Sequence, residues 1–326
     1  MKPNNLRLVN WMAFFVLLVS FVWMTGCSKD NSVVDPQGSI DQSTKAAMEK
    51  VAVSDETVAS FEPNYNEEDV TGFVLGKVAT QIYPVKVWQK MTRVSRNFDA
   101  TYSGDTAYGK VTSNFEGTLY VAGSYTKSQS GSPVVIDTVV SKQFSTSIVH
   151  NVILVKTASQ DTSKEHWKVV AVSLPEGGTL TSNIQIQKMT LFLANGDTLN
   201  ITSPNNYYLY KMTGKRRMIP SVSKGAALKV RVELTSAYAD TDFVSVTHGA
   251  IYDSFMKGHY RVKTKFNLIS STPEGASYRK VYEATIKTNQ YMGYFHAVVN
   301  AIPRGVVMDD KAPVETNTWG IPYFVK

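Results

Sequence analysis

Cysteine is nearly absent from this sequence of 326 residues, and its single example, Cys27, directly follows an apolar run. A chain with one cysteine forms no internal disulfide, so burial and hydrogen bonds alone must stabilise its folded parts. A free thiol in an oxidising compartment is prone to oxidation and to pairing with other chains. The position of Cys27 therefore predicts a modified residue rather than a core or catalytic one.

The sequence also lacks the short motifs of common catalytic and ligand-binding sites. It contains no G-x-S-x-G, no G-x-x-x-x-G-K-[ST], no G-x-G-x-x-G after a strand and no calcium-loop pattern. Five histidines are present, and none are spaced at i, i+2 or i, i+4 as a zinc site favours: His150, His166, His248, His259 and His296. We therefore expect no catalytic residue, no cofactor and no metal site.

Long runs of one charge are missing as well. The formal net charge is +7, but the basic residues are scattered over many predicted strands. Scattered charge is typical of a solvated surface, so we expect no nucleic-acid partner. The exception is a compact cationic turn at Lys215, Arg216 and Arg217. We interpret it either as a contact for anionic headgroups or anionic polysaccharide, or as a solvated loop.

The first 26 residues have the layout of a secretory signal. Lys2 and Arg7 precede an apolar core at residues 11–24. This core has 14 residues, whereas a helix that spans a bilayer needs about 20. We therefore expect a cleaved signal rather than a permanent transmembrane helix.

The residues that follow the core, Met24-Thr25-Gly26-Cys27, resemble the lipobox of bacterial lipoproteins. Met stands where Leu is usual, and Thr stands where Ala or Ser is usual. The resemblance covers residues 1–27 and implies that Cys27 carries diacylglycerol and becomes the mature N-terminus. Two or more acyl chains give stable membrane anchoring. Ser28 fits sorting to the outer membrane, facing either the periplasm or the cell surface.

Residues 27–39 are polar and predict a flexible tether after the lipid. A helix is predicted to start at Asp41, which can cap it, and a second short helix is predicted within residues 54–61. Long β-rich runs follow, and the first turn between them falls at residues 103–105. Gly109 and Gly117 lie inside one such run and predict bends or bulges.

A turn predicted at Pro175-Glu176-Gly177-Gly178 divides the folded part into domains at 40–178 and 179–326. The order of helices and long strands over residues 40–175 resembles nuclear-transport-factor-2-like folds, which implies a curved sheet with helices in its concavity. A two-sheet β domain with a helical extension is the alternative. His150 lies on an apolar strand. It is either a general base lining a pocket or a hydrogen-bonded core histidine.

Short strands separated by turns fill residues 179–326 and predict a sandwich or barrel. The segment around Gly293-Tyr294 resembles the tyrosine-corner region of immunoglobulin-like sandwiches, although the cysteine pair and the strand tryptophan of antibody domains are absent. Asp240 and Asp242 are interpreted as a weak calcium site or as exposed loop acids.

The fold class predicted is thus mainly β: a curved-sheet domain with one or two short helices, then an immunoglobulin-like sandwich. The leading hypothesis for function is a lipid-anchored envelope protein, not an enzyme, that binds or assembles with a protein or glycan partner. One alternative is an enzyme or small-ligand binder with a pocket at His150. Another is a carbohydrate-binding protein with aromatic residues as its platform: Tyr207, Tyr208, Tyr210, Tyr323 and Phe324.

Overall fold

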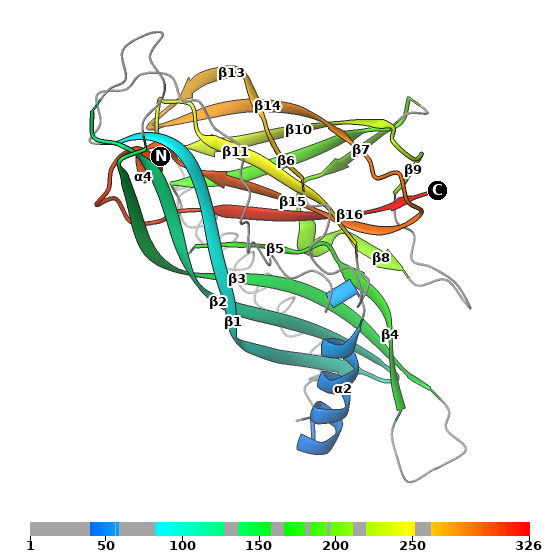
Figure 1. The fold of residues 1–326 in the computed structure, drawn as a ribbon. Helices are drawn as coiled ribbons and strands as arrows, with labels where there is room; N and C mark the ends of the chain where they lie inside the picture. The colour runs from blue at the N-terminus through cyan, green and yellow to red at the C-terminus, as the bar shows by residue number, and fades with distance from the viewer. Residues whose placement is uncertain are drawn as a thin grey trace, which may run out of the picture. The chain divides into compact units, whose positions relative to one another are not determined.

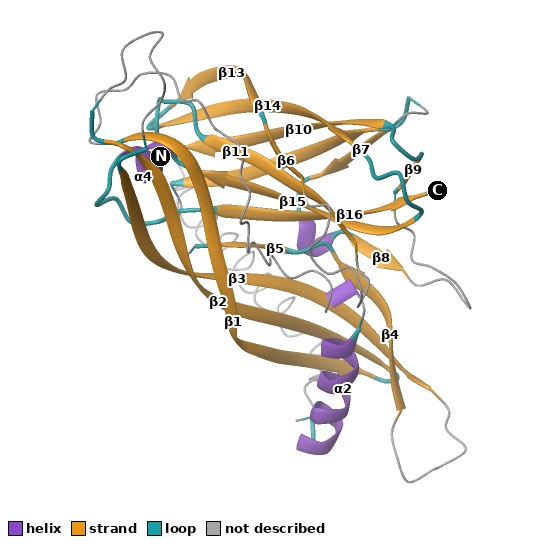
Figure 2. Ribbon diagram, viewed as in Figure 1, coloured by secondary structure: helices purple, strands orange, loops and turns teal. Residues whose placement is uncertain are grey.

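Antiparallel strands make up most of the chain that the computed structural model describes (Figures 1 and 2). The prediction of a mainly-β fold is confirmed. No described helix has the length and apolar character needed to cross a membrane. Ile40–Lys326 form one compact unit. The residues that the structure describes are 40–55, 57–58, 82–126, 136–157, 166–179, 183–193, 196–210, 220–251 and 262–326.

The predicted first helix is α2 (Gln42–Ser54), and its cap is confirmed. Oδ1 of Asp41 accepts hydrogen bonds from the backbone N–H groups of Ser43 at 3.0 Å and Thr44 at 2.9 Å. These bonds satisfy two of the amide groups that a helix start leaves without partners. Hydrogen bonds from the side chains of Ser43 and Thr44, together with the backbone bonds, hold the pKa of Asp41 below its usual value. Half of the second predicted helix, residues 54–61, lies outside the described residues.

Most of the chain belongs to one large curved sheet and one smaller sheet. The larger sheet has the spatial order β1 (Tyr83–Ser103), β2 (Thr106–Ser124), β3 (Thr138–Thr157), β5 (Glu176–Gly178), β16 (Asn317–Val325), β15 (Gly293–Ile302), β11 (Phe243–Ile251) and β12 (Val262–Lys265). Beside this path, β4 (His166–Ser173) pairs with β3 and with β8 (Tyr208–Tyr210), and β9 (Ser221–Val222) pairs in parallel with β16.

Strands β1, β2 and β3 are long and bend together (Figure 1). The predicted turn between β1 and β2 is confirmed, with Gly104 at a positive φ of 59°. The predicted bulges at Gly109 and Gly117 are wrong, because the register breaks of the β1–β2 pair lie on β1, at Pro84/Lys86 and Arg93/Ser95.

The two glycines instead leave space for rings on neighbouring strands. A methyl group on Gly109 would lie 2.5 Å from the ring of Phe98, and one on Gly117 would lie 2.7 Å from the ring of Phe144. Both distances are shorter than two non-bonded carbon atoms can approach. The glycines are therefore required for packing, and the predicted bends at these positions stay a prediction.

Residues along β3 alternate between the two faces of the sheet. The face that carries Ile148, His150 and Val152 is called the inner face, and the face that carries Val149, Asn151 and Ile153 is called the outer face. At one end of the inner face, Met48 and Ala52 of α2 belong to the same apolar cluster as Val152. At the other end, the inner face shares a cluster with β15 and with α4 (Arg304–Met308). The inner face is therefore core, whereas the outer face carries half-buried residues of β3 beside exposed residues of β2 such as Tyr108 and Lys110.

The turn predicted at residues 175–178 is wrong, because Glu176–Gly178 form strand β5 between β3 and β16. Gly177 pairs with Ile148 on one side and Thr318 on the other, and a methyl group on Gly177 would lie 1.9 Å from the Ser147 carbonyl oxygen. Turn residues thus form a strand because only glycine allows this close approach. The division into domains at residue 178 stays a prediction, and strands from both sides of it share the larger sheet.

The sandwich predicted for the C-terminal half has two layers. Its second layer is the smaller sheet, in the order β13 (Asn267–Glu274), β14 (Ser277–Lys287), β10 (Ala227–Ser236), β6 (Ile184–Phe192) and β7 (Thr198–Ile201). One apolar cluster contains Val230 and Val232 of β10 together with Val299 of β15 and Trp319 of β16. The two sheets therefore bury a common core, as a β-sandwich requires. A short 3₁₀ helix, η1 (Pro204–Asn206), precedes β8.

Candidate functional site

Several residues singled out in the sequence cannot be placed. Cys27 and the cationic turn at Lys215, Arg216 and Arg217 lie outside the described residues. The same holds for the side chain of Tyr294, the proposed tyrosine-corner residue. These assignments stay predictions.

His150 is in the inner face of β3 and is almost fully buried, at 2% exposure. Its Nδ1 lies 3.3 Å from the carbonyl oxygen of Ser173, so Nδ1 carries the proton in this contact. Asp99 of β1 forms an ion pair with Lys45 of α2 at 3.5 Å. The burial and the hydrogen bond of His150 match the core-histidine interpretation, and its role as a base stays a prediction.

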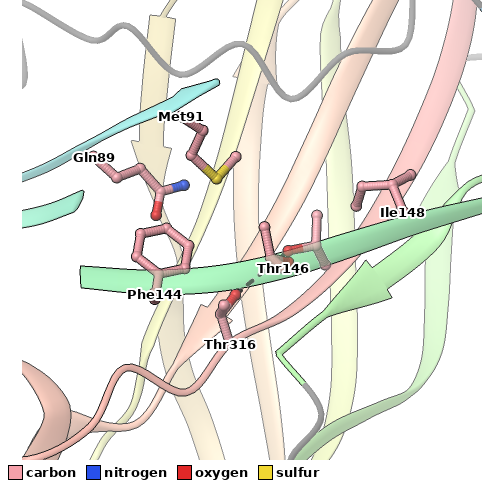
Figure 3. A pocket seen from close by; sticks show the side chains of 7 residues that line it. Gln89, Met91, Phe144, Thr146, Ile148 and Thr316 are labelled. Carbon is pink, nitrogen blue, oxygen red and sulfur yellow. Dashed lines mark hydrogen bonds between the residues drawn. The ribbon is translucent and has the colours of Figure 1, made fainter. Parts of the chain in front are cut away.

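A small cavity lies on the inner face, but His150 is not among its lining residues (Figure 3). The volume open to the centre of a water molecule is about 10 Å³, which holds at most about one water. Gln89 contributes the buried Oε1 atom, which has no hydrogen-bond partner among the described residues. The cavity thus suits a single bridging water and not an organic ligand. Its lining residues are Gln89, Met91, Phe144, Thr146, Ile148, Thr316 and Thr318.

Asp240 is exposed, as the loop-acid interpretation expects, and the weak calcium site stays a prediction. Asp242, in contrast, is buried and is not an exposed loop acid. Its Oδ2 lies 2.8 Å from Nζ of Lys280, and both side chains are 0% exposed. Ser236 Oγ donates to Oδ1 at 3.1 Å, and the Tyr282 hydroxyl donates to Oδ2 at 3.3 Å. Burial raises the pKa of Asp242, while the hydrogen bonds from Lys280, Ser236 and Tyr282 oppose that rise. An ammonium group therefore occupies the place that a cation would need.

The ammonium group of Lys280 also donates to the backbone carbonyl of Asp240. Tyr282 accepts a hydrogen bond from the backbone N–H of Asp242 at 2.8 Å, which closes the network. No cluster of three or more His, Cys, Asp and Glu that would suit a metal occurs within the described ranges. The buried polar groups of the sandwich thus serve the fold.

The outer face of β2, β3, β4 and β8 carries an exposed tyrosine cluster. Ladder pairing aligns Tyr108 of β2 with Ile153 of β3, Ile153 with Ala171 of β4, and Ala171 with Tyr210 of β8. Tyr208 lies two residues before Tyr210 on the same side of β8. Tyr108 is 53% exposed and Tyr210 is 50% exposed, so about half of each ring faces solvent. We call Tyr108, Tyr208 and Tyr210, with Asn151 and Ile153 between them, the tyrosine surface.

Contacts inside the tyrosine surface link its members. The rings of Tyr208 and Tyr210 are 6.3 Å apart between centroids and tilted by 43°. Partial burial raises the pKa of the Tyr208 hydroxyl, the nearby hydroxyls of Tyr210 and Tyr108 add to that rise, and a hydrogen bond with Asn151 opposes it. The Asn151 amide also donates to the backbone carbonyl of Asn205 at 2.9 Å, which fixes its orientation. The surface is therefore ordered before any ligand arrives.

Polar side chains surround the three rings. Lys110 is the ladder partner of Asn151, and Asp99 of β1 is the ladder partner of Lys110. Lys168 of β4 lies opposite Val155, beyond Ile153 along β3. All three charged side chains are exposed. An aromatic centre with donors and acceptors at its edge is the composition of a binding site.

The other aromatic candidates from the sequence do not join this surface. Tyr323 is 1% exposed and stacks on Phe295 at 5.6 Å between ring centroids. Tyr207 is half-buried against the sandwich core, and Phe324 is half-buried. Sequence reasoning named Tyr208 and Tyr210 as members of an aromatic platform, but it missed Tyr108, whose place depends on the pairing of four strands.

Comparison with protein-family models, with curated proteins and with solved structures finds no match for this chain. The chain's own residues and geometry therefore carry every functional inference that follows.

Proposed function

We propose that this chain is a lipid-anchored protein of a bacterial outer membrane that acts by binding rather than by catalysis. The observation that carries the proposal is the lone Cys27, placed directly after a short apolar core and the small residues Thr25 and Gly26. A thioether-linked lipid at this cysteine accounts both for its position and for the lack of a partner thiol.

The described residues support a binding role. The buried charges of Lys280 and Asp242 in the sandwich pair with each other, which is a structural contact. The described cavity has room for about one water molecule and not for a substrate. The tyrosine surface, in contrast, is solvent-exposed and presents aromatic and polar groups together. A tethered protein with such a surface is suited to hold a partner near the membrane.

The anchor is tested by following the chain in a bacterial host. We expect the wild-type chain in the membrane fraction, with a mass at its N-terminal peptide that matches diacylglycerol on Cys27. Cys27→Ala should abolish the lipid and leave the signal uncleaved, and globomycin should likewise make the uncleaved precursor of the wild type accumulate. An unmodified sulfhydryl at Cys27 in the purified chain would refute the proposal.

A further inference from the structure

We propose that the tyrosine surface binds a carbohydrate chain. This inference deepens the proposed binding role by naming the class of ligand, and it rests on that role. It concerns Tyr108, Tyr208 and Tyr210 with their polar neighbours.

The spacing of the rings suits an extended ligand. Tyr108 and Tyr210 occupy the two ends of one row that crosses β2, β3, β4 and β8. Three strand spacings of about 4.8 Å place their backbones about 14 Å apart. Ile153 and Ala171 lie between them in the row, and neither has a side chain as long as tyrosine. A short oligosaccharide laid across the strands would meet a ring at each end.

The chemistry of the surface matches that of a sugar. A pyranose ring has an apolar face of C–H groups and an edge of hydroxyl groups. Tyrosine supplies both an apolar ring face and a polar hydroxyl, so it contacts both parts of a sugar. Asn151 adds an amide next to the hydroxyl of Tyr208, and the pair is already joined by a hydrogen bond.

The charges at the rim favour hydroxyl groups over a strongly ionic ligand. Lys110 and Asp99 are ladder partners, and Asp99 also pairs with Lys45 of α2 at 3.5 Å, so the rim carries both signs of charge. Asp99 offers an acceptor, while Lys110 and Lys168 offer donors, and all are exposed enough to reach a ligand. Carbohydrate hydroxyls use donors and acceptors alike.

A protein partner fits this surface less well. The centres of protein interfaces are depleted in charged side chains, especially lysine and aspartate. Here Lys110 lies beside Asn151 in the same cross-strand row, close to the rings. The apolar area is also divided by these polar groups rather than contiguous, unlike a typical docking patch.

The experiment compares the full-length purified chain, solubilised in mild detergent, with a double variant and a control. The probes are immobilised mannan, dextran, xylan and polygalacturonate, and affinity is then measured on soluble oligosaccharides of any that bind. We expect at least one of these glycans to retain the wild-type chain. The double variant Tyr108→Ala/Tyr210→Ala should bind that glycan at least about tenfold more weakly. Tyr291→Ala is the control, because Tyr291 is 58% exposed on a different turn, and it should leave binding unchanged.

Circular dichroism and the melting temperature of each variant show whether the fold is retained. Three outcomes would each overturn the carbohydrate inference. They are a failure of all four glycans to bind the chain, equal binding by the double variant, and capture of a protein by a photo-crosslinker at position 108 in intact cells. Those outcomes leave the lipid anchor untouched, because the mass of the N-terminal peptide that carries Cys27 tests the anchor separately.

Discussion

The ammonium nitrogen of Lys280 lies 2.8 Å from Oδ2 of Asp242, and neither side chain has any exposed surface. Lys280 belongs to β14 of the smaller sheet, whereas Asp242 directly precedes β11 of the larger sheet. The ion pair therefore connects the two layers of the sandwich. Each charge depends on the other, because a buried charge without a counter-charge is strongly unfavourable.

We expect Lys280→Met to lower the free energy of unfolding by about 3–5 kcal/mol, because the Asp242 carboxylate would stay buried without its partner. Adding Asp242→Leu to the same chain should restore most of the loss, since an apolar pair needs no counter-charge. Urea denaturation measures both variants. Lys287→Met is the control, because Lys287 is an exposed lysine on the same strand. Equal stability of the two single variants would contradict the structural role of the pair.

Gly177 of β5 should tolerate no side chain. A methyl group there would lie 1.9 Å from the Ser147 carbonyl oxygen, so Gly177→Ala must push β5 away from β3. We expect a loss of stability of about 1–3 kcal/mol or more. Gly305→Ala in α4 is the matched control, because nothing lies within 4 Å of its added methyl group. The melting temperatures of the two variants test this prediction. Identical values would refute the close packing of β5 against β3.

His248 should make the fold sensitive to mild acid. It is 4% exposed, its Nε2 has no hydrogen-bond partner among the described residues, and burial lowers its pKa to about 4. The unfolded chain, with a histidine pKa of about 6.5, binds more protons than the folded chain between these two values. Stability is therefore fully present above about pH 6.5 and falls as the pH drops toward 4.

Protonation of His248 alone should lower the free energy of unfolding by about 2 kcal/mol between about pH 7.5 and about pH 5. Denaturant titrations of the wild type and of His248→Gln at both pH values measure it, and the variant should lose less stability on acidification. His166→Gln serves as the control, since His166 is exposed on β4. The same pH dependence in all three chains would disprove the assignment to His248.

Lys142 of β3 holds the segment that follows α4. Its ammonium group donates to the backbone carbonyls of Val306 at 2.5 Å, Ala312 at 3.1 Å and Asp309. Burial lowers the pKa of Lys142, and the nearby Asp309 and Asp310 oppose that shift. The lysine thus replaces the capping groups that a helix end requires.

We expect Lys142→Met to reduce stability by about 3 kcal/mol, because carbonyl groups near α4 would lose their donor. Hydrogen–deuterium exchange should also speed up at residues 304–312 relative to the rest of the chain. The exposed Lys90 of β1 provides the control variant, Lys90→Met. Unchanged exchange at residues 304–312 in the Lys142 variant would contradict this role.

Local signals in the sequence predicted local features well. The cap at Asp41, the turn at Gly104 and the mainly-β character depend on neighbouring residues, and all three are confirmed. Strand β5 was missed because Pro175 and two glycines have the composition of a turn, and only its two neighbouring strands make it a strand.

Long-range partners were beyond sequence reasoning. Asp242 reads as a loop acid because Lys280, which neutralises it, is 38 residues further along the chain. Tyr108 joins Tyr208 and Tyr210 only through the registers of the β2–β3, β3–β4 and β4–β8 pairs. Periodicity indicates which side of a strand a residue faces, but not which residues of distant strands share its row.

Strand β16 is the last strand of the chain, yet it lies inside the larger sheet, between β5 and β15. A nascent chain that has not reached Asn317 therefore has a gap in this sheet, with β5 and β15 each lacking a neighbour. We expect the sheet to close only after synthesis reaches its final residues. Loss of the nine residues of β16 should therefore be far more damaging than their number suggests.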